Sequence, residues 1–229
     1  MDARHRPASG TIRADRASVS SRDATASATI PDRAEVGRLL AQAAGGDSGA
    51  WRTLVRVFAP RVHGLLRAQC RDPELAEEIT QSTFCTVAAR IGDYEESGRF
   101  EPWLFRIAMN RLRDEMRRRA RQARAAGDAI GEAAGATRER GSPDADAELR
   151  DRLRDAMARL GEADREIIDL RHVGGLSFKE LSEYYDEPVG TLLARHHRAL
   201  KKVRALLESM GVEAGDLEDR DRAAGERAP

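Results

Sequence analysis

Apolar residues at helical spacing form two blocks in this chain, and a stretch without that pattern separates them. The first block begins at Val36 and Leu40, where apolar residues recur every three or four positions. The second begins at Leu149 and continues through Leu153 and Met157 with the same spacing. Such spacing places the apolar side chains along one face of an α-helix. The sequence therefore predicts an all-α fold made of two small helical domains.

Two helix starts in the first block can be predicted from local residues. Asp47 or Ser48 is expected to cap the second helix of the block. Asp72 followed by Pro73 suits a cap with proline in the first turn, and predicts the start of a third helix. The predicted inward face of this third helix holds Leu75, Ala76, Ile79, Thr83 and Val87.

The segments outside the two blocks lack the apolar residues that a folded core needs. Residues 1–32 mix Arg, Ser, Ala, Thr and Asp without periodicity, and residues 210–229 are polar and acidic. Too few apolar side chains are present there to offset the entropy lost on ordering the backbone. Residues 123–147 carry Gly, Ala and a Ser-Pro, a composition typical of linkers. We expect a disordered N-terminal tail (1–32), a helical domain (33–122), a flexible linker (123–147), a second helical domain (148–209) and an acidic C-terminal tail (210–229).

Charge and hydropathy limit the classes of function. The chain carries 39 Lys and Arg against 39 Asp and Glu, so any basic surface must be offset elsewhere. No apolar run approaches the ~18 residues that span a bilayer, and no apolar segment follows the Arg-containing N-terminus. We therefore expect a cytoplasmic protein with no membrane insertion. Cys70 and Cys85 lie far apart, outside any metal-ligand spacing, and predict buried reduced thiols, no metal site and no cofactor.

The first candidate site is a predicted helix that starts near Pro102, a residue suited to the first helical turn. Nine Arg and three acidic residues lie between positions 99 and 124, a balance that suits a polyanion, although a solvated basic face explains it equally well. One row of side chains predicts a buried stripe: Phe105, Met109, Leu112 and Met116. A second row, about 100° around the helix, is mostly basic: Arg106, Asn110, Arg113 and Arg117.

The segment before this helix, YEESGRFEPW, adds aromatic rings to the basic row. Tyr94, Phe100 and Trp103 lie in or beside it, together with Arg99. Aromatic rings next to cations suit unstacked bases, because each base offers a face for stacking and each nucleotide carries a phosphate. Packing in the core explains Phe100 and Trp103 singly as well. Their combination with the basic row favours a site for single-stranded nucleic acid.

The second block ends in a helix, a tight turn and another helix. In LSFKE, Ser177 can accept from the backbone of Glu180 while the Glu180 side chain bonds back, which is a capping box. The short helix that follows runs to about Tyr185, and the chain turns before Pro188. This spacing is typical of a helix-turn-helix, whose second helix enters the major groove of DNA.

The last helix separates apolar side chains from basic ones. Between Val189 and Arg204 there are five Lys or Arg and no carboxylate, although pairs of Glu and Lys are usual on a solvated helix. A carboxylate there would repel phosphate, so the pattern favours contact with a polyanion. We expect His196 to pack as a neutral residue and His197 to face either phosphate or solvent. The predicted inner face holds Val189, Leu192, Leu193, His196, Leu200, Val203 and Leu207, and the outer face Thr191, Arg195, Arg198 and Lys202.

Both blocks resemble parts of one protein family. DPELAEEITQSTFCTVAARIGDYEESGRFEPWLFRIAMNRLRDEMRRR resembles the promoter-melting domain, region 2, of bacterial RNA polymerase sigma factors of the extracytoplasmic-function group in the sigma-70 family. AMARLGEADREIIDLRHVGGLSFKELSEYYDEPVGTLLARHHRALKKVRALL resembles their C-terminal helix-turn-helix domain, region 4. The resemblance covers residues 33–208 in the family's order. It implies a sigma factor, which is not an enzyme and uses no cofactor.

The resemblance also implies partners and residue roles. The partners are RNA polymerase core, through its β and β′ subunits, and promoter DNA, both duplex and single-stranded; an anti-sigma factor is allowed as well. Residues at the clamp-binding positions of polymerase are Glu77, Glu78, Gln81 and Phe84. Those at positions that bind the melted minus-ten element are Arg99, Phe100, Trp103, Arg106, Asn110, Arg113 and Arg117. Those at positions that contact the minus-thirty-five element are Ser177, Lys179, Thr191, Arg195, His197, Arg198 and Lys202.

Two departures from the family pattern limit what the resemblance implies. Ser82 stands where the family often has an acid, which puts the strength of clamp docking in doubt. Leu193 and His196 stand where Lys or Arg and an aliphatic residue, respectively, are common, so the promoter specificity does not carry over from the family.

Three other functions stay open from the sequence. A helix-turn-helix regulator that acts without core polymerase would leave the basic and aromatic first domain unexplained. A DNA-processing enzyme such as a recombinase or nuclease would need a carboxylate cluster, an activated Ser or Tyr, or a metal spacing, and none of these patterns is evident. A helical adaptor that only sequesters a partner would tolerate charge reversal on both basic faces. Strand separation itself needs no catalytic group, because a pocket that holds a flipped base offsets the lost stacking.

Overall fold

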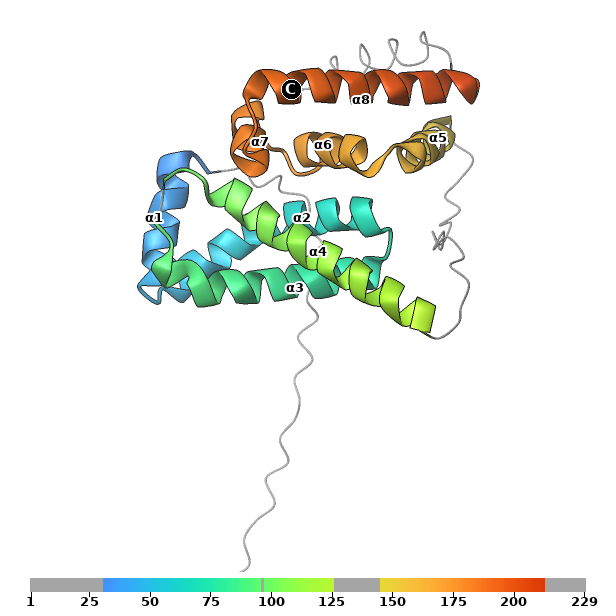
Figure 1. The fold of residues 1–229 in the computed structure, drawn as a ribbon. Helices are drawn as coiled ribbons and strands as arrows, with labels where there is room; N and C mark the ends of the chain where they lie inside the picture. Colours follow the sequence, from blue (N-terminus) through green and yellow to red (C-terminus); the bar gives the residue numbers. More distant parts are fainter. Residues whose placement is uncertain (1–30, 96, 126–144, 213–229) are drawn as a thin grey trace, which may run out of the picture. The chain divides into compact units, whose positions relative to one another are not determined.

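The computed structural model describes residues 31–95, 97–125 and 145–212 (Figure 1). In these ranges the chain forms eight α-helices and one short 3-10 helix, without a strand. This confirms the predicted all-α fold. Most of the predicted tails and linker lie outside the described residues.

The first pair of helices is α1 (Arg33–Ala44) and α2 (Ser48–Cys70). Asp32 caps α1 and Asp47 caps α2, each with a carboxylate oxygen that accepts from backbone N–H groups of the first turn. These N–H groups have no partner within the helix, so the caps satisfy them and fix where each helix begins. The predicted cap of the second helix, Asp47 or Ser48, is therefore Asp47.

The next helix, α3 (Pro73–Arg90), begins as the sequence predicts. Asp72 accepts from the backbone N–H of Leu75 at 3.0 Å, and Pro73 occupies the first turn. A 3-10 helix (Ile91–Asp93) follows it. The side chains predicted to face inward are all buried: Leu75, Ala76, Ile79, Thr83 and Val87.

The long helix α4 (Phe100–Ala125) starts two residues before Pro102. Phe105, Met109 and Leu112 are buried, which confirms most of the predicted apolar stripe. Met116 is 45% exposed, so the prediction that it is buried is wrong. The buried residues of α4 end at Leu112, and Figure 1 shows the last turns of α4 extending beyond the helices against which it packs.

The second set of helices is α5 (Ala145–Arg159), α6 (Glu162–His172), α7 (Phe178–Tyr185) and α8 (Val189–Ser209). In Figure 1, α8 lies along α5, α6 and α7, and it contacts all three. Leu153 on α5 was predicted to be inward but is 43% exposed, because only one side of this helix meets α8.

The predicted helix-turn-helix is formed by α7 and α8. Ser177 and Glu180 make the capping box: the Glu180 carboxylate accepts from the Ser177 backbone at 2.7 Å, and Ser177 Oγ accepts from the Glu180 backbone at 3.2 Å. Asp186 makes the tight turn with a φ of 57°, a left-handed conformation that Asp adopts more readily than most residues. Pro188 then precedes the first turn of α8.

The beginning of the predicted acidic tail packs against this set of helices. Arg152 on α5 donates to the Met210 carbonyl at 3.0 Å, and Val212 is 5% exposed. Burial of Val212 extends the apolar packing of this set of helices past the end of α8.

One contiguous cluster of buried apolar residues runs through both sets of helices. It includes Phe58 and Phe105 from the first set and Leu170 and Leu181 from the second. Contacts join α2 to α6 and α4 to α7, and the eight helices belong to one compact unit. The boundaries of the two predicted domains stay a prediction.

The two cysteines differ in exposure, and neither forms a disulfide. Cys70 is half-buried, and burial raises the pKa of its thiol. Cys85 is exposed, so the prediction that it is buried is wrong. Phe84, the residue before it, occupies the inward side of α3 and is 7% exposed.

Candidate nucleic-acid interface

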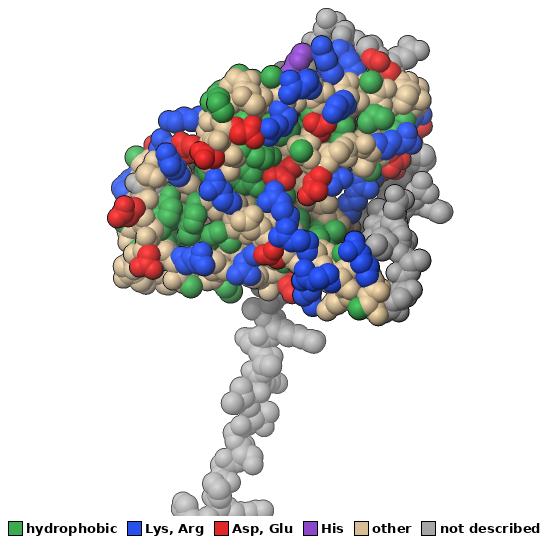
Figure 2. Space-filling model, in the orientation of Figure 1, with side chains coloured by type: hydrophobic (Ala, Val, Ile, Leu, Met, Phe, Trp, Pro, Cys, Tyr) green, Lys and Arg blue, Asp and Glu red, His purple; other side chains and the backbone are tan. Residues whose placement is uncertain are grey.

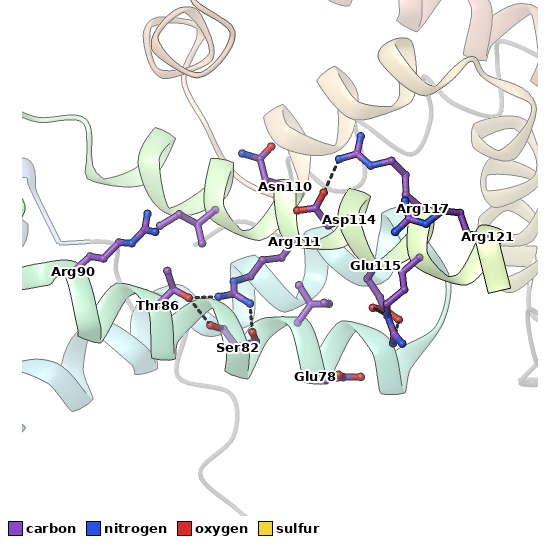
Figure 3. Close-up of a pocket in the computed structure, with 13 residues that line it drawn as sticks. Glu78, Ser82, Thr86, Arg90, Asn110, Arg111, Asp114, Glu115, Arg117 and Arg121 are labelled. Atoms are coloured by element: carbon purple, nitrogen blue, oxygen red, sulfur yellow. Dashed lines mark hydrogen bonds and ion pairs between the residues drawn. The ribbon is translucent and has the colours of Figure 1, made fainter.

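A groove of about 700 Å³ lies between α3 and α4 (Figure 3). Ile79 from α3 and Ile107 from α4 contribute apolar side chains to it. Asn110 and Arg117 from the predicted minus-ten set and Glu78 from the predicted polymerase set line it as well. Its charged lining is mostly basic: Arg90, Arg111, Arg117, Arg118 and Arg121 against Glu78, Asp114 and Glu115.

Arg111 connects the two walls of the groove. Its guanidinium donates to Ser82 Oγ and to Thr86 Oγ1, both on α3 (Figure 3). Ser82 is one of the two departures from the pattern of the resemblance, and here its hydroxyl accepts from an arginine of the neighbouring helix. The sequence reasoning missed Arg111 because it followed one apolar row and one basic row of α4, and Arg111 lies on neither. The signal that could have found it is its i+4 spacing from Ile107 on the adjacent row.

The basic row of α4 is held by contacts within the protein. Arg106 donates to the carbonyl oxygens of Glu183 and Tyr184 at 2.7 and 2.6 Å. Arg113 donates to Asn110 Oδ1 at 3.1 Å and to Glu166 Oε2 at 2.5 Å. Arg117 pairs with Asp114 at 2.6 Å on the same helix, where both side chains are exposed.

The pKa of Arg113 reflects this partner. Burial acts to lower the pKa, but the hydrogen bond from Arg113 to Glu166, the nearby Tyr184 hydroxyl and the charge of Glu166 together outweigh it, so the pKa of Arg113 is raised. The guanidinium therefore stays charged, and the pair is partly removed from solvent: Arg113 is 31% exposed and Glu166 is 6% exposed at the side chain.

The aromatic residues divide between the core and the surface. Phe100 is 3% exposed and meets the ring of Phe58 edge to face, with ring centroids 5.2 Å apart. Trp103 and Tyr94 are half-buried and stack on each other with centroids 4.8 Å apart. Arg99 is exposed beside them. Phe100 therefore supports the Tyr94–Trp103 pair from the core side, as the packing alternative had it.

Six of the seven predicted minus-thirty-five residues are exposed, and the seventh, Arg195, is half-buried. Thr191, His197 and Arg198 on α8 and Lys179 on α7 are exposed. The remaining three have partners within the second set of helices. Ser177 caps α7, and Lys202 pairs with Asp164. Arg195 pairs with Glu187 at 2.6 Å and lies 5.5 Å from the Tyr185 ring centroid.

The face of α8 that is buried is narrower than the sequence predicts. Val189, Leu193 and Leu200 were assigned to the inner face, but they are 39%, 45% and 40% exposed. Steps of 100° place them roughly 40° to 80° away from the buried line of Leu192, His196, Ala199, Val203 and Leu207. The same geometry brings Gly190, Ala194 and Lys201 to the centre of the outward face, and the sequence reasoning missed them.

Two basic surfaces cover the C-terminal half of α4 and α8. Figure 2 shows their Lys and Arg side chains together with other basic side chains elsewhere on this face and with acidic side chains interspersed. The predicted polymerase contacts lie on α3, where Glu77, Glu78 and Gln81 are exposed and Gln81 donates to Glu77 at 2.8 Å. Phe84 is buried and faces the edge of Trp51.

Two further properties bear on the type of site. Within the described residues, no group of three or more His, Cys, Asp or Glu could hold a metal ion. In that same part of the chain, no helix combines the length and apolar character needed to cross a bilayer.

Comparison with known proteins defines the class. The family model for Sigma-70 region 2 matches residues 54–122, and the model for Sigma-70 region 4 matches residues 156–205. These ranges fall on α2–α4 and on α5–α8, the elements that carry the two basic surfaces. The chain belongs to the sigma-70 family of bacterial RNA polymerase sigma factors, in the extracytoplasmic-function (ECF) group.

Individual relatives span most of the chain. RNA polymerase sigma factor CarQ of Myxococcus xanthus is 36% identical over 169 residues, 73% of this chain and 95% of CarQ. ECF RNA polymerase sigma factor SigW of Bacillus subtilis is 26% identical over 174 residues, 72% of this chain and 92% of SigW. A solved structure of CnrH in complex with the cytosolic domain of CnrY is similar with a TM-score of 0.56 and 25% identity, over 78% of this chain and 99% of CnrH.

Proposed function

We propose that this chain binds RNA polymerase core and directs initiation at promoters through two separate contacts with DNA. In this proposal α8 enters the major groove at the minus-thirty-five element, and α4 with its preceding loop holds the melted minus-ten strand. The observation that carries the proposal is the presence of two basic helices within regions 2 and 4 of a sigma factor, in the family's order. Its place of action would be the cytoplasm, where bacterial polymerase transcribes DNA.

The minus-ten contact would use charge and stacking together. Arg106, Asn110 and Arg113 follow one row of α4, and the Tyr94–Trp103 pair lies near the start of this helix. Arginines that neutralise phosphates release counterions, and an aromatic face replaces part of the stacking that a flipped base loses. Binding energy of this kind separates strands without a catalytic group.

The minus-thirty-five contact would use the outward face of α8. Thr191, His197 and Arg198 are exposed there, and no carboxylate lies on α8 before Glu208. Gly190 and Ala194 at the centre of this face are small, which favours close approach of the helix to base edges. Arg195 would have to exchange Glu187 for DNA in order to read a base, because the same guanidinium donors serve both.

The proposed polymerase contact lies on α3. Glu77, Glu78 and Gln81 form an exposed polar row, with α4 behind it. The solved CnrH relative is in complex with the cytosolic domain of CnrY, and another similar chain, a sigma factor RpoE, is in complex with the anti-sigma factor NepR. We propose that an anti-sigma factor is also a partner of this chain.

Replacement of Asn110 by Ala tests the minus-ten contact. With core polymerase on a promoter that the protein recognises, we expect the Asn110→Ala variant to lower the permanganate reactivity of unpaired minus-ten thymines several-fold. Binding to the closed duplex, measured at a temperature too low for melting, should stay unchanged. Gln122→Ala, on the exposed last turns of α4, is the matched control. Equal losses in duplex binding and in melting would contradict strand capture by α4.

A further inference from the structure

Side chains of the first set of helices bind the second set directly. Arg61 and Gln69 on α2 and Arg106 and Arg113 on α4 all donate hydrogen bonds across this junction. Arg61 donates to the Gly174 carbonyl at 2.6 Å, and Gln69 donates to Asp169 Oδ2 at 2.7 Å. Arg106 donates to the Glu183 and Tyr184 carbonyls at 2.7 and 2.6 Å, and Arg113 donates to Glu166 Oε2 at 2.5 Å. Two of these donors, Arg106 and Arg113, belong to the row that is proposed to hold the minus-ten strand.

Glu166 is the acceptor for Arg113, and it sits in a built acceptor site. It is 4% exposed, its Oε2 receives Arg113, and its Oε1 lies 3.1 Å from the Tyr184 hydroxyl and 3.3 Å from the Tyr185 hydroxyl. A buried carboxylate is tolerated when it is paired with a cation and hydrogen-bonded on its other oxygen. The tyrosine hydroxyls belong to α7, but the cation is Arg113 of α4, so the charge of Glu166 is paired only while α4 lies against this set of helices.

Arg106 binds the other element of the second set, the C-terminal end of α7. The carbonyls of Glu183 and Tyr184 belong to the last turn of that helix, where carbonyl groups have no partner within the helix. The negative end of the helix dipole lies at the same place and favours a cation. The guanidinium also lies 5.9 Å from the ring centroid of Tyr184.

The same residues reach the proposed minus-thirty-five helix. Tyr185 donates to Glu166 and carries Arg195 of α8 over its ring, while Arg195 pairs with Glu187. A continuous chain of contacts therefore leads from Arg113 on α4 to Arg195 on α8. Each guanidinium in this chain donates to protein oxygens, and these same donors are the ones that would bind a phosphate or base oxygen.

We propose that Glu166, Tyr184 and Tyr185 form an internal latch that closes the minus-ten surface of the free chain by occupying Arg106 and Arg113. The proposal rests on the proposed function, because it takes these two arginines as contacts to the minus-ten strand. Single-stranded DNA and the latch compete for the same donors, so the affinity of the free chain for DNA is reduced to the fraction of open molecules. Docking on polymerase must separate α4 from α6 and α7 before the strand can bind.

The Glu166→Gln variant weakens the latch while preserving its shape. The amide oxygen still accepts from the two tyrosine hydroxyls, but the negative charge opposite Arg113 is lost. We expect this variant of the full chain to bind a labelled oligo(dT) about tenfold more tightly than the wild type in fluorescence anisotropy, since a charged hydrogen bond is removed from the closed state. Glu162→Gln, exposed on the same helix, is the control and should bind like the wild type. Equal affinities of the two variants, both folded by circular dichroism, would overturn the latch.

A distance measurement tests the closed arrangement without altering the latch. Spin labels are attached to the exposed Cys85 on α3 and to Ala205→Cys on α8, in a Cys70→Ser background. We expect one narrow distance distribution for the free chain and a shift to longer distances when oligo(dT) is added. A broad distribution in the free chain, or an unchanged distribution when DNA is bound, would overturn the proposal.

Failure of the latch can be told from failure of the proposed function. Transcription from a promoter by core polymerase and the wild-type chain depends on the proposed function alone. Promoter-specific transcripts together with a broad distance distribution would reject the latch and leave the function intact. A narrow distance distribution without any transcripts would reject the proposed function. It would also reject the role of the latch in closing a minus-ten surface.

Discussion

Asp169 on α6 is a buried carboxyl group whose ionisation opposes folding at neutral pH. It is 5% exposed, and burial raises its pKa from 3.8 to about 6, although the charges of Arg165 and Arg71 and the hydrogen bond from Gln69 act to lower it. The folded state therefore binds this proton more tightly than the unfolded state does. The contribution of Asp169 to stability is fully present below about pH 4 and is lost as the pH rises to about 6.

Asp169→Asn should therefore stabilise the protein at neutral pH. A shift of about two pKa units corresponds to at most about 3 kcal/mol, and we expect the free energy of unfolding at pH 7.5 to rise by ~1 to 3 kcal/mol. The difference from the wild type should nearly vanish at pH 4. Urea unfolding at several pH values measures it, with Asp155→Asn on the exposed side of α5 as control. A difference that does not change with pH would contradict the raised pKa.

The pKa of His196 is shifted in the opposite direction from that of Asp169. It is buried, its Nε2 lies 3.0 Å from His172 Nε2, and its ring meets Phe178 edge to face, so the prediction of a packed histidine is confirmed. Burial lowers the pKa of His196 and of His172. Their contribution to stability is present above about pH 6.5 and is lost as the pH falls. The effect of Asp169 must therefore be taken as a difference between variant and wild type at each pH.

At the scale of the helix, the apolar side chains of α8 extend around more of its circumference than the part that is buried. Leu192 and Leu193 are neighbours in sequence, yet they are 0% and 45% exposed. The contacts of α8 are with α5, α6 and α7, which lie along one side of it. Apolar residues outside that arc stay in solvent, where they are available to a ligand that approaches from the outward face.

Truncation of the two leucines should have very different costs. Leu192→Ala removes a fully buried side chain, and we expect a loss of ~2 to 5 kcal/mol in the free energy of unfolding. Leu193→Ala should change it by less than ~0.5 kcal/mol, because its side chain is largely exposed. Urea unfolding of both variants measures the difference. Similar losses would mean that Leu193 is part of the core and that the buried face has been assigned too narrowly.

At the scale of the whole molecule, the sequence predicted local structure well and long-range partners poorly. The caps Asp47, Asp72 and Ser177 follow from a few neighbouring residues, and all three are confirmed. The partners of Arg106 and Arg113 lie 77 and 53 residues away, and no local pattern indicates them. The exposure of Met116 and Leu193 also depends on packing. Periodicity locates an apolar row on a helix, but it does not show how far the neighbouring helices extend along or around that row.

Arg195→Ala tests whether α8 reads DNA sequence. We expect the variant, bound to core polymerase, to lose ~1 to 3 kcal/mol of binding at the recognised promoter and to lose preference at one base pair of the minus-thirty-five element. Arg204→Ala, on the exposed C-terminal part of α8, is the control. Binding to promoters mutated at each base pair measures both effects. Equal weakening on every sequence would indicate a phosphate contact, and no loss would exclude Arg195 from the site.

Transcription from a randomised promoter library by purified core polymerase tests the central claim most directly. Sequencing of the transcribed templates should show two enriched blocks at a fixed separation, one for α8 and one for α4, and the enrichment should require this protein. Templates no more enriched than with core polymerase alone would contradict the claim. Binding to duplex DNA without any promoter-specific transcript would instead identify a helix-turn-helix regulator that acts without polymerase.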